Sequence, residues 1–141
     1  MHSFFDTNIL VYLFDDDAPD KKLRAQELLK NETAAGKTLL STQVFQEFYV
    51  TVTKKLTVPL SSDNAEDVLR QLMVLPHVEI NSRHILGAIQ KSQEFRLSFW
   101  DALIIEAAIV GGADILYTED LQHGQVIEQL KIRNPFVDST R

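Results

Sequence analysis

The 141-residue sequence contains no cysteine. Without cysteine there can be no disulfide framework, no thiol nucleophile and no cysteine-bound zinc, so any metal would be held by oxygen or imidazole ligands. The four histidines have no spacing typical of a metal site, and no serine lies in the pattern of a nucleophile elbow. Hydrolysis through a serine or histidine centre therefore has little support.

The chain also lacks long apolar runs and an excess of positive charge. No apolar run approaches the ~18 residues of a membrane-spanning helix, and Met1 to Leu10 lacks the features of a signal peptide. We therefore expect a cytoplasmic protein with no membrane partner. A formal net charge of -6 is the wrong sign for a broad nucleic-acid-binding field, although a local basic groove is compatible with it. The length suits a single domain spanning residues 1–141.

Short apolar runs alternate with longer helical patterns along the chain. Helices are expected at 7–14, 21–30, 42–56, 61–75, 82–95 and 99–112. Strands are expected at 3–5, 38–41, 78–80, 115–118 and 136–137. Strands separated by such helices predict a parallel sheet that is covered by helices on both faces. Right-handed crossovers then bring all strand carboxyl ends to one edge, where open α/β sheets bind ligands.

Four acidic residues from distant parts of the sequence are predicted to meet at that edge. Asp6 and Asp120 follow the first and fourth expected strands. Glu47 lies in the first two turns of the helix after the second strand, and Asp101 lies in the first turn of the helix before the fourth. Each also has an ordinary explanation: a helix cap for Asp6, a capping box with Ser98 for Asp101, a surface position for Glu47 and a turn for Asp120. Four independent explanations of this kind would not require the same edge.

Carboxylates that converge repel one another. A pair ~4 Å apart costs about 1 kcal/mol in water-like surroundings and about 4 kcal/mol at an effective dielectric constant of ~20, so the cluster needs a cation or a proton. Hard oxygen ligands of this kind select Mg²⁺ or Mn²⁺. A divalent ion at this edge could offset charge on a phosphoryl oxygen, which is the chemistry of phosphodiester hydrolysis.

The segments FFDTNIL, QEFY, SFWDALI and ADILYTEDLQHG carry these acids in an order and spacing that resemble the PIN-domain family, most closely its VapC-type toxin ribonucleases. The resemblance covers essentially the whole chain. It implies a three-layer α/β/α fold with a central parallel sheet and a Mg²⁺- or Mn²⁺-dependent endoribonuclease. It further implies a cognate antitoxin, a homodimer, and RNA products with a 5′-phosphate and a 3′-hydroxyl.

The resemblance also assigns roles to individual residues. The acids that would be both catalytic and metal-binding are Asp6, Glu47, Asp101 and Asp120. The polar residues that would orient ligands or contact phosphate are Thr7, Asn8 and Thr118. Many relatives carry another aspartate two or three residues after the fourth acid, where this chain has Gln122 and His123. Basic residues that could contact phosphate, or simply face solvent on helices, are Lys21, Lys22, Arg24, Lys54 and Lys55.

Other functions share parts of this pattern. An aspartyl-phosphate phosphatase would need a second aspartate two positions after the first, where this chain has Asn8. A phosphoreceiver domain would need a lysine at the end of a late strand, and the sequence supplies none there. A solitary PIN nuclease, and an inactive PIN-like module that binds RNA or protein, stay open. For a nuclease, single-stranded or looped RNA is the favoured substrate, because its backbone is accessible and its bases are unstacked.

Overall fold

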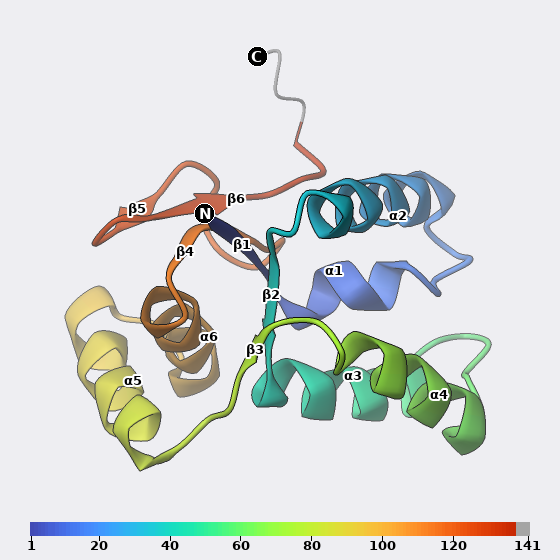
Figure 1. Ribbon diagram of the computed structural model, residues 1–141, viewed down its shortest axis with the longest axis horizontal. Coiled ribbons are helices and arrows are strands. Elements are labelled where there is room, and N and C mark those ends of the chain that lie inside the picture. Colours follow the sequence, from blue (N-terminus) through green and yellow to red (C-terminus); the bar gives the residue numbers. More distant parts are fainter. Residues whose placement is uncertain (138–141) are drawn as a thin grey trace.

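The computed structural model describes residues 1–137 as a sheet with helices on both faces (Figure 1). The strands are β1 (His2–Phe5), β2 (Thr38–Ser41), β3 (His77–Val78), β4 (Ala113–Tyr117), β5 (Val126–Ile127) and β6 (Leu130–Arg133). The helices are α1 (Thr7–Tyr12), α2 (Pro19–Ala34), α3 (Thr42–Lys54), α4 (Ser62–Leu72), α5 (Ser82–Phe95) and α6 (Phe99–Val110). Residues 138–141 of the expected domain lie outside this description. Within residues 1–137, no helix is long and apolar enough to cross a membrane.

The strand order, β3-β2-β1-β4-β6-β5, puts the first strand near the middle of the sheet. Every neighbouring pair is parallel except β5 and β6, which are antiparallel. From β1 the chain adds β2 and then β3 toward one edge of the sheet, and helices α1 to α4 cover one face (Figure 1). Helices α5 and α6 then lie on the opposite face and lead to β4, which is the other neighbour of β1. The expected α/β/α architecture is therefore confirmed. The strand order reverses between β1 and β4, and open α/β sheets bind ligands at such a switch point.

Burial on both faces holds β1 and β4 in place. Phe4, Phe5 and Leu116 are completely buried, as the central strands of a parallel sheet require. Phe48 of α3 and Ile105 of α6 are also completely buried and bring the two helix layers into the same core. A side chain that directly follows β1 is therefore carried by a fixed backbone.

The expectation of a strand at 136–137 is wrong. After β6 the chain turns instead, because Asn134 Oδ1 accepts a hydrogen bond of 2.9 Å from the Phe136 N–H. Pro135 within this turn has no N–H to contribute to a strand ladder. The last strand of the parallel set is β6, whose alternating burial shows one face against the core and the other toward solvent.

A partly buried ion pair joins α5 to α6. Lys91 Nζ lies 2.6 Å from Glu106 Oε1 and 3.2 Å from Glu128 Oε2. The side chains of Lys91 and Glu106 are only 15% and 12% exposed, so water solvates neither charge well. Each charge therefore depends on the other for compensation.

Lys91→Met is expected to lower the free energy of unfolding by about 2 to 4 kcal/mol, because Glu106 would keep a poorly solvated charge without its main partner. Urea unfolding at pH 7 measures this loss. Arg70→Met is the matched control, since it removes an exposed pair with Glu66 and should cost less than about 1 kcal/mol. Equal losses in the two variants would contradict the importance of burial at the Lys91 pair.

Candidate active site

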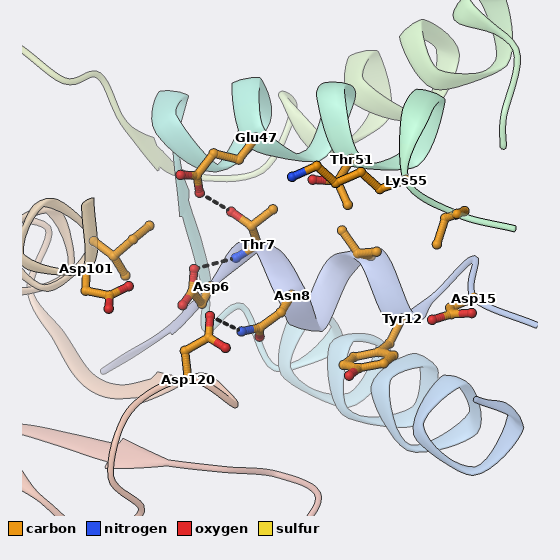
Figure 2. Close-up of a pocket in the computed structure, with 13 residues that line it drawn as sticks. Asp6, Thr7, Asn8, Tyr12, Asp15, Glu47, Thr51, Lys55, Asp101 and Asp120 are labelled. Atoms are coloured by element: carbon orange, nitrogen blue, oxygen red, sulfur yellow. Dashed lines mark hydrogen bonds between the residues drawn. The ribbon is translucent and has the colours of Figure 1, made fainter. Parts of the chain in front are cut away.

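A pocket of about 390 Å³ lies among α1, α3, the start of α6 and the loop after β4 (Figure 2). All four acids singled out from the sequence line it. They come from four separate elements: the end of β1, the second turn of α3, the first turn of α6 and the loop after β4. These acids are Asp6, Glu47, Asp101 and Asp120. The structure thus brings them together at the switch point of the sheet.

Strand register explains why Asp6 and Thr118 lie side by side. Phe5 pairs with Tyr117, and the Asp6 N–H donates to the Tyr117 carbonyl oxygen at 3.0 Å. One residue further on, Thr118 Oγ1 donates to Asp6 Oδ2 at 2.8 Å, while the Thr7 N–H donates to Asp6 Oδ1 at 2.7 Å. Asp6 is therefore the N-cap of α1 as well as a pocket residue, and both of its carboxylate oxygens are held.

The Asp6 carboxylate is strongly perturbed because only 5% of the residue is exposed. The pKa of Asp6 is raised from its usual 3.8 to about 7, mainly by burial and to a smaller extent by the nearby charges of Asp120 and Glu47. Hydrogen bonds from Thr118 and from the Thr7 N–H act in the opposite direction. A buried carboxyl with such a pKa at a pocket wall is typical of functional sites.

The polar neighbours of Asp6 hold two of the other acids, Glu47 and Asp120. Asn8 Nδ2 donates to Asp120 Oδ2 at 2.9 Å, and Thr7 Oγ1 donates to Glu47 Oε1 at 2.7 Å (Figure 2). Thr118 Oγ1 also accepts a hydrogen bond of 3.1 Å from the Asp120 N–H. The three polar residues singled out from the sequence therefore each contact at least one pocket acid.

Asp101 enters the pocket from the first turn of α6. Its N–H donates to Ser98 Oγ at 3.1 Å, so Ser98 caps the helix as expected. Burial raises the pKa of Asp101, the hydrogen bond with Ser98 lowers it, and the charges of Asp120 and Glu47 raise it. The carboxylates thus interact across the pocket even though they come from different elements.

The family model described as the PIN domain matches residues 3–128. The chain belongs to the PIN-domain family. A search of curated proteins found none that matches.

Similar solved structures show the same PIN fold. VapBC2 from Rickettsia felis, bound to a promoter DNA fragment, has a TM-score of 0.68 and 19% identity, covering 95% of this chain and 98% of that chain. A toxin-antitoxin complex from Klebsiella pneumoniae has a TM-score of 0.67 and 20% identity over the same shares of the two chains. VapC20 from Mycobacterium tuberculosis, described as a sarcin-ricin loop cleaving toxin, has a TM-score of 0.60 and 17% identity, covering 84% and 89%.

The charges of Asp120 and Glu47 act on both Asp6 and Asp101. Carboxylate oxygens are the ligands that Mg²⁺ and Mn²⁺ prefer, so the residue types in the pocket of this PIN domain fit a hard divalent ion. The side chains of residues 1–137 do not, as they stand, place three or more Asp, Glu, His or Cys groups where they could hold a metal. Metal ligation by the four acids therefore stays a prediction. Gln122 and His123 do not line the pocket, and His123 Nδ1 accepts a hydrogen bond from the Asn134 N–H at 3.0 Å.

The basic residues noted in the sequence divide into two groups in the PIN domain. Lys55 lines the pocket and is exposed, and Lys54 is exposed beside it on the chain. Lys21 and Lys22 form ion pairs with acidic neighbours, and Arg24 Nε donates to a backbone carbonyl oxygen. Lys55 is therefore the best placed of the five to meet a ligand in the pocket.

Gln43 was not singled out from the sequence, although it lies one helical turn before Glu47 on α3. It is 4% exposed, and its Nε2 lies 3.3 Å from Glu47 Oε2 and 3.1 Å from the Trp100 carbonyl oxygen. The spacing of four residues from Glu47 was the available signal, since such residues lie on one face of a helix.

Proposed function

We propose that this PIN-domain protein is a Mg²⁺- or Mn²⁺-dependent endoribonuclease, and that it is the toxin of a VapBC-type pair. The observation that carries the proposal is the convergence of four carboxylates at the switch point of a PIN fold. The description of VapC20 as a toxin that cleaves the sarcin-ricin loop supports a ribonuclease, and the neighbouring toxin-antitoxin complexes support an antitoxin partner.

The four acids have unequal surroundings, which suggests a division of roles. When bound, the divalent ion would offset negative charge on the phosphoryl group that is attacked. Asp6 directly follows the buried strand β1, and Thr118 and the Thr7 N–H hold both of its carboxylate oxygens. The other proposed ligands are Glu47, Asp101 and Asp120. Asp120 is exposed on its loop and held by Asn8, so an incoming RNA strand could reach it.

The remaining pocket residues suit recognition of an RNA backbone. Lys55 lines the pocket from the end of α3 (Figure 2), where its positive charge could contact a phosphate beside the one that is cleaved. We expect single-stranded or looped RNA, with products that carry a 5′-phosphate and a 3′-hydroxyl.

Incubation of the purified protein with end-labelled single-stranded and hairpin RNAs tests this proposal. Cleavage is expected in Mg²⁺ or Mn²⁺, with none in EDTA and full recovery when excess metal is restored. The predicted product ends can be checked with two enzymes. A polynucleotide kinase should label the 5′ ends only after a phosphatase has removed their phosphate. Cleavage that persisted in EDTA, or labelling of one aspartate by acetyl phosphate without RNA cleavage, would overturn the proposal.

We also propose an antitoxin partner and a homodimer, by the same resemblance. The adjacent open reading frame provides the simplest test of the partner. A short upstream frame with a DNA-binding start and an extended tail is expected. A gene that stands alone would favour a solitary PIN nuclease.

A further inference from the structure

Gln43 occupies an unusual place for an amide side chain. It lies in the first turn of α3 and is 96% buried between this helix and the start of α6. Glutamine is mostly found on protein surfaces, and a buried amide costs free energy unless its polar atoms are hydrogen-bonded. The contacts of this side chain therefore need an explanation.

The two partners of Gln43 are both hydrogen-bond acceptors. Its Nε2 donates to Glu47 Oε2 at 3.3 Å and to the Trp100 carbonyl oxygen at 3.1 Å. Only the NH₂ end of the amide suits two acceptors. Its Oε1 is consequently buried without a hydrogen-bond partner among residues 1–137. An apolar side chain of similar size would avoid this unpaired oxygen, so stability alone does not account for an amide here.

The two contacts connect two of the pocket acids. Glu47 has three side-chain torsions, and its carboxylate would be mobile without partners. Thr7 Oγ1 holds Oε1 of Glu47 from the side of Asp6, while Gln43 holds Oε2 and is itself attached to the residue before Asp101. Glu47 is thus fixed at both oxygens, between the elements that carry Asp6 and Asp101.

We propose that Gln43 is a positioning residue for the metal site, and that its bridge from Glu47 to the Trp100 carbonyl sets the placement of Glu47 relative to Asp101. This inference rests on the proposed metal-dependent function. Residues that orient metal ligands from behind typically change metal affinity by about 10- to 100-fold when they are replaced.

Gln43→Met tests the proposal, because it keeps the length of the side chain and removes both donors. The dissociation constant for Mn²⁺ alone, measured by electron paramagnetic resonance of the free ion, is expected to rise about 10-fold or more. Thr38→Val is the matched control. It removes a partly buried hydrogen bond with Thr33, 2.8 Å in length, at the opposite end of β2, and should leave Mn²⁺ affinity unchanged.

A second measurement needs no metal. Trp100 is the only tryptophan of the chain, and Gln43 holds its backbone carbonyl, so intrinsic fluorescence reports on changes at the start of α6. The emission spectrum and anisotropy of the metal-free protein are expected to change in Gln43→Met and to stay the same in Thr38→Val. Gln43→Asn, which keeps the amide but is one methylene too short to reach both acceptors, should behave like Gln43→Met and replaces it if that variant does not fold.

The outcomes separate this inference from the function on which it rests. Unchanged Mn²⁺ affinity in both Gln43 variants would overturn the positioning role while leaving the proposed nuclease intact. A wild-type protein that bound no Mn²⁺ would overturn both. Weaker Mn²⁺ binding in the Gln43 variants, together with normal binding in Thr38→Val, is the result that the structure predicts.

Discussion

Asp6→Asn is expected to lower the rate of RNA cleavage by about a thousandfold or more. The substitution keeps the size of the side chain but removes the charge that would hold the divalent ion. A loss of about 4 kcal/mol of transition-state stabilisation corresponds to this factor, and it is a reasonable share of what a metal ion supplies. Initial rates on the best RNA of the panel, in saturating Mn²⁺, provide the measurement.

A control must exclude a general effect of removing one negative charge. Asp67→Asn serves this purpose, since Asp67 is exposed on α4 and does not line the pocket. It should cleave at the wild-type rate. If Asp6→Asn also cleaved at that rate, the assignment of Asp6 to the site would be wrong.

The raised pKa of Asp6 is also expected to make the free energy of unfolding of the metal-free protein depend strongly on pH. The pKa of Asp6 is 3.8 in its usual state and about 7 in the folded protein, so the folded state keeps a proton that the unfolded state releases. The free energy of unfolding should therefore fall as pH rises from 4 to 7, by about 4 kcal/mol from Asp6 alone, and level off above 7. Below pH 4 both states are protonated and Asp6 contributes no penalty.

Urea unfolding of wild type and Asp6→Asn in EDTA, from pH 4 to pH 8, isolates this contribution. Other groups titrate in both proteins, including Asp101, and cancel in the difference between the two curves. Addition of Mg²⁺ at pH 8 is expected to stabilise wild type more than Asp6→Asn, because a ligand that binds only the folded state stabilises it. A difference between the two proteins that did not vary with pH would contradict a raised pKa for Asp6.

Much of the architecture could be predicted because the central strands are encoded by continuous apolar runs. Phe4 and Phe5, like Leu39 and Leu40, are followed at once by a polar residue that begins a helix, so strand and helix boundaries were visible in the sequence. The β5–β6 hairpin was not predicted, since β6 alternates apolar and charged residues in place of a continuous apolar run and β5 has only two residues. Such short strands take their conformation from the sheet on which they pair, which a local pattern does not reveal.

For the candidate site, the positions of the acids could be predicted from the sequence, but their hydrogen-bond partners could not. The edge of the sheet on which Asp6 and Asp120 lie follows from topology alone, because both come after parallel strands. Which side chains hold them depends on register and on the approach of helices, as in the pairing of Asn8 with Asp120. The spacing of four residues between Gln43 and Glu47 is visible in the sequence. The contact of Gln43 with the Trp100 carbonyl oxygen depends on the approach of α3 to the start of α6, which no spacing along the chain specifies.

The central place of β1 has a consequence for how the protein is made. β1, which ends directly before Asp6, pairs with β4, which comes far later in the sequence. A growing chain on the ribosome has Asp6 and Glu47 long before it has Asp101, Thr118 and Asp120. The pocket can therefore be completed only after Asp120 has been synthesised and β4 has paired with β1, so a shorter nascent chain lacks the full set of pocket acids.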